Sequence, residues 1–446
     1  MEPHAFRRSA RGRPGAGEAQ EAFVIPRVVV AAPPRTHWIP PGGLLAGQLS
    51  LGFAWLMLIA LGTRHGGALA PLAWVHLVAL GGVTTIALSV LIHVVPAFTD
   101  ATWRRERMAR VAIAPFWIGA VALSAGFWFD ATGVVAWAAR LAVIALVFYF
   151  VPALITLRTA IPAGGTEAAV ARALGGTLLA LAVTAALGLA MSLALGGMLP
   201  PAVLNGTPPI HAAFGVLGWL TLLVMGVSAR TLRPIAGVRT RSPLLHVFGG
   251  SAVLVGTLLL AAGFAFAVAG IVASGFVLCS AGAGAYVFDV ADVLGRATVP
   301  HRPPQAFVGA ALLWLCTGVV LAAGALRGAP TGAAAIYVLL AGWVGQMVNA
   351  HLYHIGIRLV STMARGEDDE TRPAELLSLP LTWATFAAFQ LAVALGVAGI
   401  LAHDDALVAA AGACGFAAWL AMCANVLLAR QRAALPPPAT LISLLG

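Results

Sequence analysis

The stretch that decides the fold is PLAWVHLVALGGVTTIALSVLIHVVPAFTD, residues 71–100. It is apolar over a length sufficient to cross the hydrocarbon core of a bilayer as one helix. His76 lies near its beginning and His93 near its end. These histidines are seventeen residues apart, which corresponds to about 25 Å along a helix, so they belong to two different sites. An ionisable side chain in a lipid-spanning helix is costly unless it has a partner, and each histidine therefore needs a neighbour or a bound group.

The composition of the whole chain is that of a helical membrane protein. Of its 446 residues, 60% are hydrophobic and only 9% are charged, and the mean hydropathy is +0.94. We therefore expect an all-α polytopic protein that lies in a lipid bilayer. Apolar runs separated by charged residues predict about twelve transmembrane helices. Their predicted ranges are 43–62, 71–98, 111–129, 134–157, 173–197, 208–229, 244–268, 271–293, 306–326, 332–357, 380–402 and 406–429.

The predicted domain organisation is one transmembrane bundle, residues 41–430, between two tails. Residues 1–40 are rich in arginine and proline and lack the apolar core of a signal peptide, which predicts a disordered cytoplasmic tail. Residues 431–446 are predicted to form a short cytoplasmic tail. The four cysteines lie in apolar segments and form no CxxC pattern, which argues against a disulfide framework or a zinc module.

The positions of the arginines predict the orientation. Of the 26 arginines, 23 lie in the tails and loops of one side of the predicted bundle. Only Arg64 and Arg327 lie in loops of the other side, and Arg140 lies inside the fourth span. The positive-inside rule therefore places both termini in the cytoplasm. The same distribution accounts for the net charge of +10 without nucleic acid as a partner.

Two histidines share the outer layer of the predicted bundle. His76 and His211 each lie four or five residues into a span that runs from outside to inside. Neutral imidazoles at matched depth on two helices are what a b-type haem needs as axial ligands. On this interpretation Gly215 and Gly218 leave room for a flat ring, and the three arginines outside the cytoplasmic side either pair with haem propionates or anchor helix ends. The alternative is a pair of histidines that hydrogen-bond between helices.

An inner layer of ionisable residues lies toward the cytoplasm. Its members are His93, His246, His351, His354, Asp289 and Asp292. His351 and His354 are three residues apart and share a helical face. With His93 and Asp289 they predict a second site that binds copper, non-haem iron or zinc, or that carries protons. The alternative is a polar network that ties helix ends together near the headgroups. His246 is the weakest member because it lies almost at the interface.

Three stretches resemble signature helices of a known superfamily. They are HLVALGGVTTIALSVLIHVVPAF at 76–98, IHAAFGVLGWLTLLVMGVSARTLRP at 210–234 and NAHLYHIGIRLV at 349–360. They resemble helices of bacterial membrane proteins related to the haem-copper oxidase superfamily, which includes cytochrome oxidase subunit I and the large subunit of nitric-oxide reductase. The resemblance implies a subunit I-like bundle of twelve spans in the cytoplasmic membrane of a bacterium. It also maps a low-spin haem ligand onto His76.

The sequence departs from the superfamily pattern at residues that carry oxygen chemistry. His211 is followed by Ala213 where the pattern has H-x-H, and no span contains adjacent histidines or His-Pro-Glu. We therefore expect a haem-binding protein that transfers electrons or binds nitric oxide or oxygen, rather than one that reduces oxygen fully. If it is an enzyme, it is an oxidoreductase, with a redox protein or quinol as its partner.

Two other functions are compatible with the sequence. One is a transporter of metal ions or small solutes, and the other is a structural subunit of a respiratory complex. Many transporters contain inverted repeats or helices broken in the middle of the membrane. In this sequence the only candidates for such breaks are Pro115 and Pro152, in the third and fourth spans.

Overall fold

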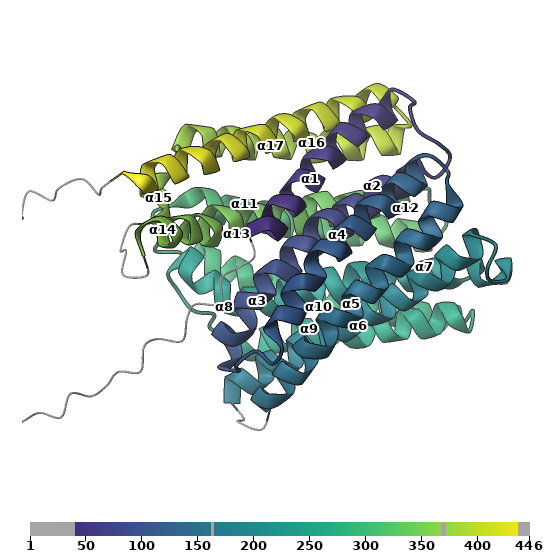
Figure 1. Ribbon diagram of the computed structural model, residues 1–446, viewed down its shortest axis with the longest axis horizontal. Helices are drawn as coiled ribbons and strands as arrows, with labels where there is room; N and C mark the ends of the chain where they lie inside the picture. Colours follow the sequence, from purple (N-terminus) through teal and green to yellow (C-terminus); the bar gives the residue numbers. More distant parts are fainter. Residues whose placement is uncertain (1–40, 162–164, 367–371, 436–446) are drawn as a thin grey trace, which may run out of the picture. The chain divides into compact units, whose positions relative to one another are not determined.

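The chain folds into a bundle of membrane-spanning helices (Figure 1). The computed structural model describes residues 41–161, 165–366 and 372–435. Within these ranges twelve helical segments are long and apolar enough to cross a bilayer, which confirms the all-α polytopic fold. They are Pro41–Gly62, Ala70–Thr99, Glu106–Trp128, Thr132–Ala160, Val170–Leu195, Thr207–Ala236, Pro243–Ala265, Ala269–Gly295, Arg302–Leu326, Gly332–Arg365, Leu379–Ala402 and Asp405–Ala434. The predicted tail at 1–40 and residues 436–446 lie outside the described residues.

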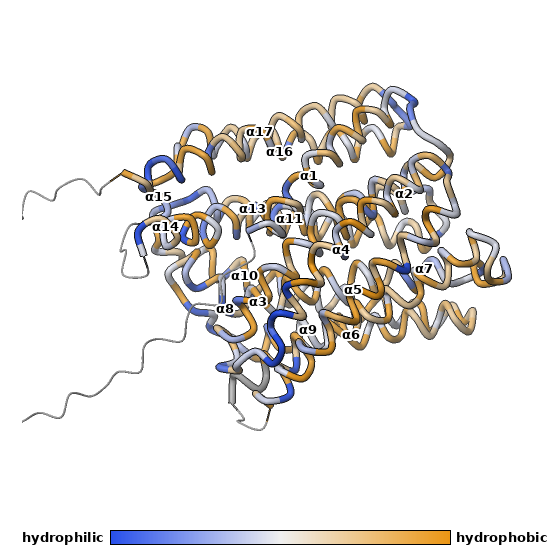
Figure 2. The backbone as a smooth tube through the Cα atoms, in the orientation of Figure 1, coloured by the Kyte–Doolittle hydropathy of each residue, from blue (hydrophilic) through white to orange (hydrophobic). Residues whose placement is uncertain are grey.

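Every predicted span coincides with an observed one, but several helices continue further at one end of the bundle. The sixth reaches Ala236 instead of 229, the tenth reaches Arg365 instead of 357, and the last reaches Ala434 instead of 429. The extra turns carry arginines, whose long apolar stems let a helix extend into the interface. Figure 2 shows hydrophobic residues along the helices and hydrophilic residues gathered toward their ends.

The two ends of the bundle differ in composition. We call the end with the loops 100–105, 237–242 and 296–301 the arginine-rich end. The opposite end contains the loops 63–69, 129–131 and 196–206, and we call it the histidine-pair end because His76 and His211 lie near it. Two short helices, η3 (Pro201–Leu204) and α15 (Pro373–Leu376), lie between spans.

Three helix hairpins make the most extensive contacts in the bundle. They are α4 (Glu106–Trp128) with α5 (Thr132–Ala160), α9 (Pro243–Ala265) with α10 (Ala269–Gly295), and α16 (Leu379–Ala402) with α17 (Asp405–Ala434). These are spans 3–4, 7–8 and 11–12, so the packing repeats every four spans. Small residues permit the close approach. In the second hairpin, a Cβ on Gly282 would lie only 2.7 Å from the carbonyl oxygen of Gly249.

The spans before these hairpins, numbers 2, 6 and 10, each contain π-helix. Span 2 consists of α2 (Ala70–His76), η1 (Leu77–Thr84) and α3 (Thr85–Thr99), and span 6 of α7 (Thr207–Ala212), η4 (Ala213–Thr221) and α8 (Leu222–Ala236). Span 10 consists of α12 (Gly332–Tyr337), η5 (Val338–Gly345), α13 (Gln346–His351), η6 (Leu352–Gly356) and α14 (Ile357–Arg365). In the most apolar stretches of spans 2 and 10, 67% and 78% of residues are buried, the two highest values in the bundle. Stretches of π-helix are rare and often lie at functional sites.

Hydrogen bonds from indole to hydroxyl groups join the three π-helical stretches. Trp219 Nε1 in η4 donates to Thr84 Oγ1 in η1 at 2.9 Å. Trp343 Nε1 in η5 donates to Thr221 Oγ1, the last residue of η4, at 3.2 Å. All four side chains are buried. Because an unsatisfied polar group in the membrane interior costs several kcal/mol, these bonds fix the rotation of spans 2, 6 and 10 relative to one another.

The two prolines in the third and fourth spans do not break their helices. α4 continues through Pro115, and α5 continues through Pro152. The hydroxyl of Thr156 donates to the carbonyl oxygen of Pro152 at 2.7 Å, which adds a bond within that part of α5. Spans 3 and 4 therefore lack the mid-membrane breaks that would have favoured a transporter.

Candidate functional site

The structure brings together the two histidines of the predicted outer layer. The ring centroids of His76 and His211 lie 6.2 Å apart, and the ring planes differ by 24°. His76 Nδ1 lies 2.8 Å from the carbonyl oxygen of Leu72, and His211 Nδ1 lies 3.0 Å from that of Thr184. A carbonyl oxygen only accepts, so Nδ1 carries the hydrogen in both rings and Nε2 carries a lone pair. Within the described part of the chain, neither Nε2 has a hydrogen-bond partner.

The position of His76 depends on the start of its helix, which is held by the loop between α4 and α5. The carboxylate of Asp130 accepts hydrogen bonds from the backbone N–H groups of Ala68 and Leu69, both at 2.9 Å. No side chain at the start of α2 caps this helix. The carboxylate of Asp130 instead binds the backbone N–H groups that lie just before its first turn. The ring of Phe127, at the end of α4, lies 4.9 Å from the ring of His76 between centroids.

His211 is positioned by the start of α7 and by helix α6 (Gly165–Leu195). The chain turns at Gly206, whose φ is 78°, and prolines in the first turn then favour the helix. The ring of His211 lies against α6 at Gly188, where a Cβ would come within 3.0 Å of its Cε1 atom. Gly188 therefore makes room for the imidazole.

The expectation that Gly215 and Gly218 leave room for a flat ring is not met at these positions. A Cβ on Gly215 would contact Thr184 at 3.3 Å, and a Cβ on Gly218 would lie 3.0 Å from the Cβ of Ala180. Both glycines face α6 and let η4 pack closely against it. The π-helix that begins at Ala213 changes the direction in which the residues after His211 face. The prediction assumed a regular α-helix and therefore placed the two glycines on the wrong face.

The distance between the two ring centroids matches that of two imidazoles that ligate one metal ion. Metal–nitrogen bonds of about 2 Å on either side of the metal place the two ring centres about 6 Å apart, in agreement with the observed 6.2 Å. Donation of Nδ1–H to a carbonyl, as in both rings, is the usual way in which a ligating histidine is oriented and presents Nε2. The alternative predicted from the sequence was a pair of histidines that hydrogen-bond between helices. His211 makes such a bond, to Thr184 on α6, whereas His76 bonds to Leu72 within its own helix.

The arginines at this end of the bundle mainly hold helix ends. Arg64 forms an ion pair of 2.6 Å with Asp405, which joins the end of α1 (Pro41–Gly62) to the start of α17. The guanidinium of Arg140 lies 4.6 Å from the centroid of the Trp137 ring and contacts the sulfur of Met198 in the loop before α7. Arg64 is thus engaged by a carboxylate of the protein, which favours the anchoring role.

The predicted inner site is not assembled as one cluster. No three His, Cys, Asp or Glu side chains among the described residues form a group that could hold a metal ion. His93 lies on α3, which packs mainly against α1, α4 and α6, whereas Asp289 lies on α10, which packs mainly against α9. Matched depth in the membrane therefore does not bring these residues together, because they belong to different helix pairs.

His351 is fully engaged in hydrogen bonds. Its Nδ1 lies 2.7 Å from the carbonyl oxygen of Met347, and its Nε2 lies 2.7 Å from the hydroxyl of Thr231 on α8. Nδ1 therefore donates and Nε2 accepts, which leaves no free lone pair for a metal. His354, one turn further, lies within range of charge interactions with His351 and His301.

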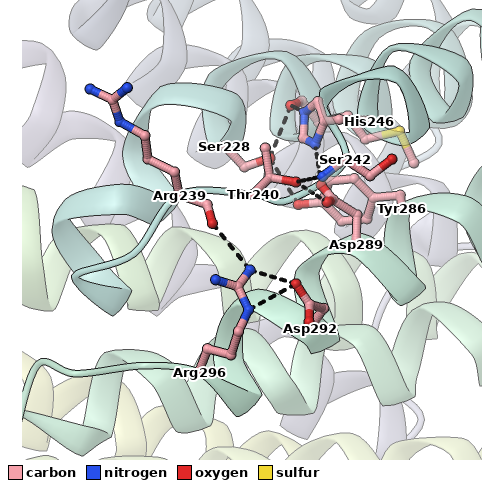
Figure 3. Close-up of polar contacts among 10 residues, drawn as sticks. Ser228, Arg239, Thr240, Ser242, His246, Tyr286, Asp289, Asp292 and Arg296 are labelled. Carbon is pink, nitrogen blue, oxygen red and sulfur yellow. Dashed lines mark hydrogen bonds and ion pairs between the residues drawn. The ribbon is translucent and has the colours of Figure 1, made fainter.

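Asp289 is paired with His246, the histidine ranked lowest from the sequence (Figure 3). His246 Nδ1 lies 3.0 Å from Asp289 Oδ2, its Nε2 lies 2.9 Å from the carbonyl oxygen of Met225, and the hydroxyl of Thr240 donates to the other carboxylate oxygen. The carbonyl takes the hydrogen of Nε2, so a second proton must lie between Nδ1 and the carboxylate. This network ties together α8, α9 and α10, as the alternative interpretation of the inner layer predicts.

Asp292 lies one turn beyond Asp289 and belongs to a separate group of charges (Figure 3). It forms ion pairs with Arg296 at 2.5 Å and Arg241 at 3.7 Å. Arg296 also donates to the carbonyl oxygen of Arg239 at 3.1 Å. The hydrogen bonds that Arg296 donates to the carboxylate of Asp292 raise the pKa of Arg296 above its ordinary value. These contacts hold the loop between α8 and α9 against the end of α10.

The sequence was also compared with protein families and with curated proteins. No protein-family model matches the chain, and no curated protein matches it significantly.

The residues that the sequence analysis missed are Asp130, Thr184 and Gly188, which position the two histidines. None of them stands in a recognisable motif, because each acts through a backbone contact with a different helix.

Proposed function

We propose that this protein binds a haem between His76 and His211 and uses it for electron transfer. The observation that carries the proposal is the pair of near-parallel imidazoles at 6.2 Å, each with its Nδ1–H on a backbone carbonyl. Two neutral nitrogen ligands on neighbouring membrane helices suit a haem iron. The sequence contains no Cys-x-x-Cys-His motif for covalent attachment, so the proposed cofactor is a non-covalent b-type haem.

The protein residues around the pair have distinct roles in this proposal. His76 and His211 would hold the iron, while the carbonyl groups of Leu72 and Thr184 fix the ring orientations and would make the imidazoles better ligands. Phe127 shields the His76 ring on one side. A bound haem of this kind supplies one-electron redox chemistry. Because two histidines would hold one iron, we favour electron transfer over the binding of nitric oxide or oxygen.

The proposal includes an orientation and a partner. The positive-inside rule places the arginine-rich end in the cytoplasm of a bacterium and the histidine pair near the outer face of its inner membrane. An electron partner would then be a redox protein on that face or a quinol within the membrane. The same orientation gives cytoplasmic termini.

The test is the haem content of the purified full-length protein and of three variants. We expect a sharp b-type α-band in the reduced-minus-oxidised spectrum, about one haem per chain by pyridine haemochrome assay, and a low-spin ferric signal in electron paramagnetic resonance. His76→Ala and His211→Ala should each lose the haem while remaining in the membrane. His65→Ala is the matched control, because His65 lies at the same end but is exposed, and its side chain hydrogen-bonds only with Thr63 among the described residues.

Full haem content in both single variants would reject the assignment of the ligands. A colourless wild-type protein, purified from cells supplied with haem, would reject the function itself. Loss of haem from all three variants, the control included, would also contradict the specific role of His76 and His211.

A further inference from the structure

A cavity lies among the helices of the bundle, and neither histidine of the pair lines it. Its volume is about 40 Å³. It lies among α1, span 2, span 10, α16 and α17, and most of its wall is apolar. Six side chains with nitrogen or oxygen atoms line it, namely Gln48, Trp55, Trp74, Asn349, Thr385 and Trp419. A bound water needs roughly 10–15 Å³ measured in this way, so the cavity has room for two or three.

Two side-chain atoms without hydrogen-bond partners belong to the wall of this cavity. In the described ranges, seven buried side-chain nitrogen and oxygen atoms lack a partner, and four of them belong to Gln48, Trp74 and Gln346. Gln48 Oε1 and Trp74 Nε1 belong to residues of the cavity wall, and Gln346 follows Gly345, which is also part of that wall. Trp74 is buried, with only 5% of its surface exposed.

The remaining polar residues of the wall restrict how these groups can be satisfied. Asn349 donates to the carbonyl oxygen of Gly345 at 3.1 Å, and the Thr385 hydroxyl donates to Leu381 at 2.9 Å. The hydroxyl hydrogen of Thr385 and one of the two amide hydrogens of Asn349 are therefore already used. Trp74 stacks on the ring of Tyr337 with centroids 5.2 Å apart, so its indole is held in place and cannot turn toward another acceptor.

We propose that the cavity binds a cluster of two or three water molecules, with Trp74 Nε1 as a donor and Gln48 Oε1 as an acceptor. Inside a membrane, a polar group without a partner is costly, and neither lipid nor the apolar wall can supply one. Water provides both a donor and an acceptor at each molecule, and a polar cavity of this size is normally hydrated, whereas a purely apolar one stays dry. The inference is independent of haem binding, because the cavity wall does not include His76 or His211.

The test uses a substitution whose effect has opposite signs for a wet and a dry cavity. Ala418 lines the cavity and is fully buried. In a dry cavity, Ala418→Val fills empty space and raises the thermal unfolding midpoint. In a wet cavity, the added methyl groups displace water and leave Trp74 and Gln48 without partners, so we expect the midpoint to fall. In a Trp74→Phe background, which removes the donor but keeps the aromatic ring, the same substitution should lower the midpoint less.

Two results would overturn the proposal. The first is a higher midpoint for Ala418→Val in the wild-type background. The second is an equal fall with and without Trp74, which would indicate steric overpacking alone. A high-resolution experimental map of the wild-type protein gives a direct readout that does not depend on the folding of any variant. It should show ordered density within hydrogen-bond distance of Trp74 Nε1, and a clear map without such density would contradict the inference.

Discussion

Asp130 provides the most informative test of how the histidine pair is positioned. Its carboxylate accepts two backbone N–H groups ahead of α2, each at 2.9 Å. Loss of a helix-capping side chain costs about 0.5–2 kcal/mol, and these bonds are exposed, so Asp130→Ala should lose about 2 kcal/mol from both together. The substitution also places alanine at a φ of 53°, where alanine is about 1 kcal/mol less favourable than aspartate, whose short polar side chain tolerates this conformation. We expect a total loss of about 3 kcal/mol.

Asp100 is a matched control for the backbone cost. It has the same φ of 53°, lies at the opposite end of span 2, and its carboxylate makes no hydrogen bond with the described residues. Asp100→Ala should therefore lose only about 1 kcal/mol. The assay is the free energy of unfolding in mixed detergent micelles, together with haem content. Because α2 carries His76, only Asp130→Ala should also lower haem occupancy. Equal losses of stability and unchanged haem in both variants would refute the positioning role.

Three further predictions concern packing and pH. Gly282→Ala should destabilise by about 1–3 kcal/mol through its clash with the neighbouring backbone, whereas Gly284→Ala, with nothing within 4 Å of its Cβ, should be neutral or stabilising. Trp343→Phe removes the hydrogen bond to Thr221 and should cost about 1–2 kcal/mol in denaturation by detergent, with no additional loss when Thr221→Val is combined with it. Burial lowers the pKa of His301 in the loop before α11 (Arg302–Leu326), so the folded state favours the neutral ring. Stability should then be constant above the ordinary pKa of about 6.5 and fall as the pH drops from there toward the lowered value. His301→Asn should flatten this dependence in thermal unfolding measured between about pH 7.5 and 5.5.

Much of the architecture could be predicted from the sequence because it depends on local properties. Each span was located from a run of apolar residues, and the structure places all twelve at the predicted positions. The depth of His76 and of His211 in their spans follows from counting residues along a helix of known rise. Both histidines lie near the same end of the bundle, as this count predicts, and their rings face each other.

The arrangement of the inner residues could not be predicted in this way. Depth alone groups His93, His351 and Asp289, yet the structure places them on different helix pairs. His246 pairs with Asp289 across 43 positions of the sequence, and no local pattern specifies which helix faces another. Sequence spacing therefore predicted a cluster around His93, His351 and Asp289 that the described residues do not form. It also ranked His246 lowest, although His246 is the histidine that pairs with Asp289.

The sequence by itself determined the positions of the twelve segments that, within the described residues, are long and apolar enough to cross a membrane, since hydrophobicity is a property of each segment. Tertiary structure decided which side chains meet, because the meeting depends on the rotation of each helix about its axis. In spans 2 and 6 that rotation is set by π-helical stretches that begin after His76 and Ala212 and end at Thr84 and Thr221. A regular helical projection fails beyond these points, because a π-turn contains more residues than an α-turn. The bonds between spans that fix the rotation join residues more than 120 positions apart.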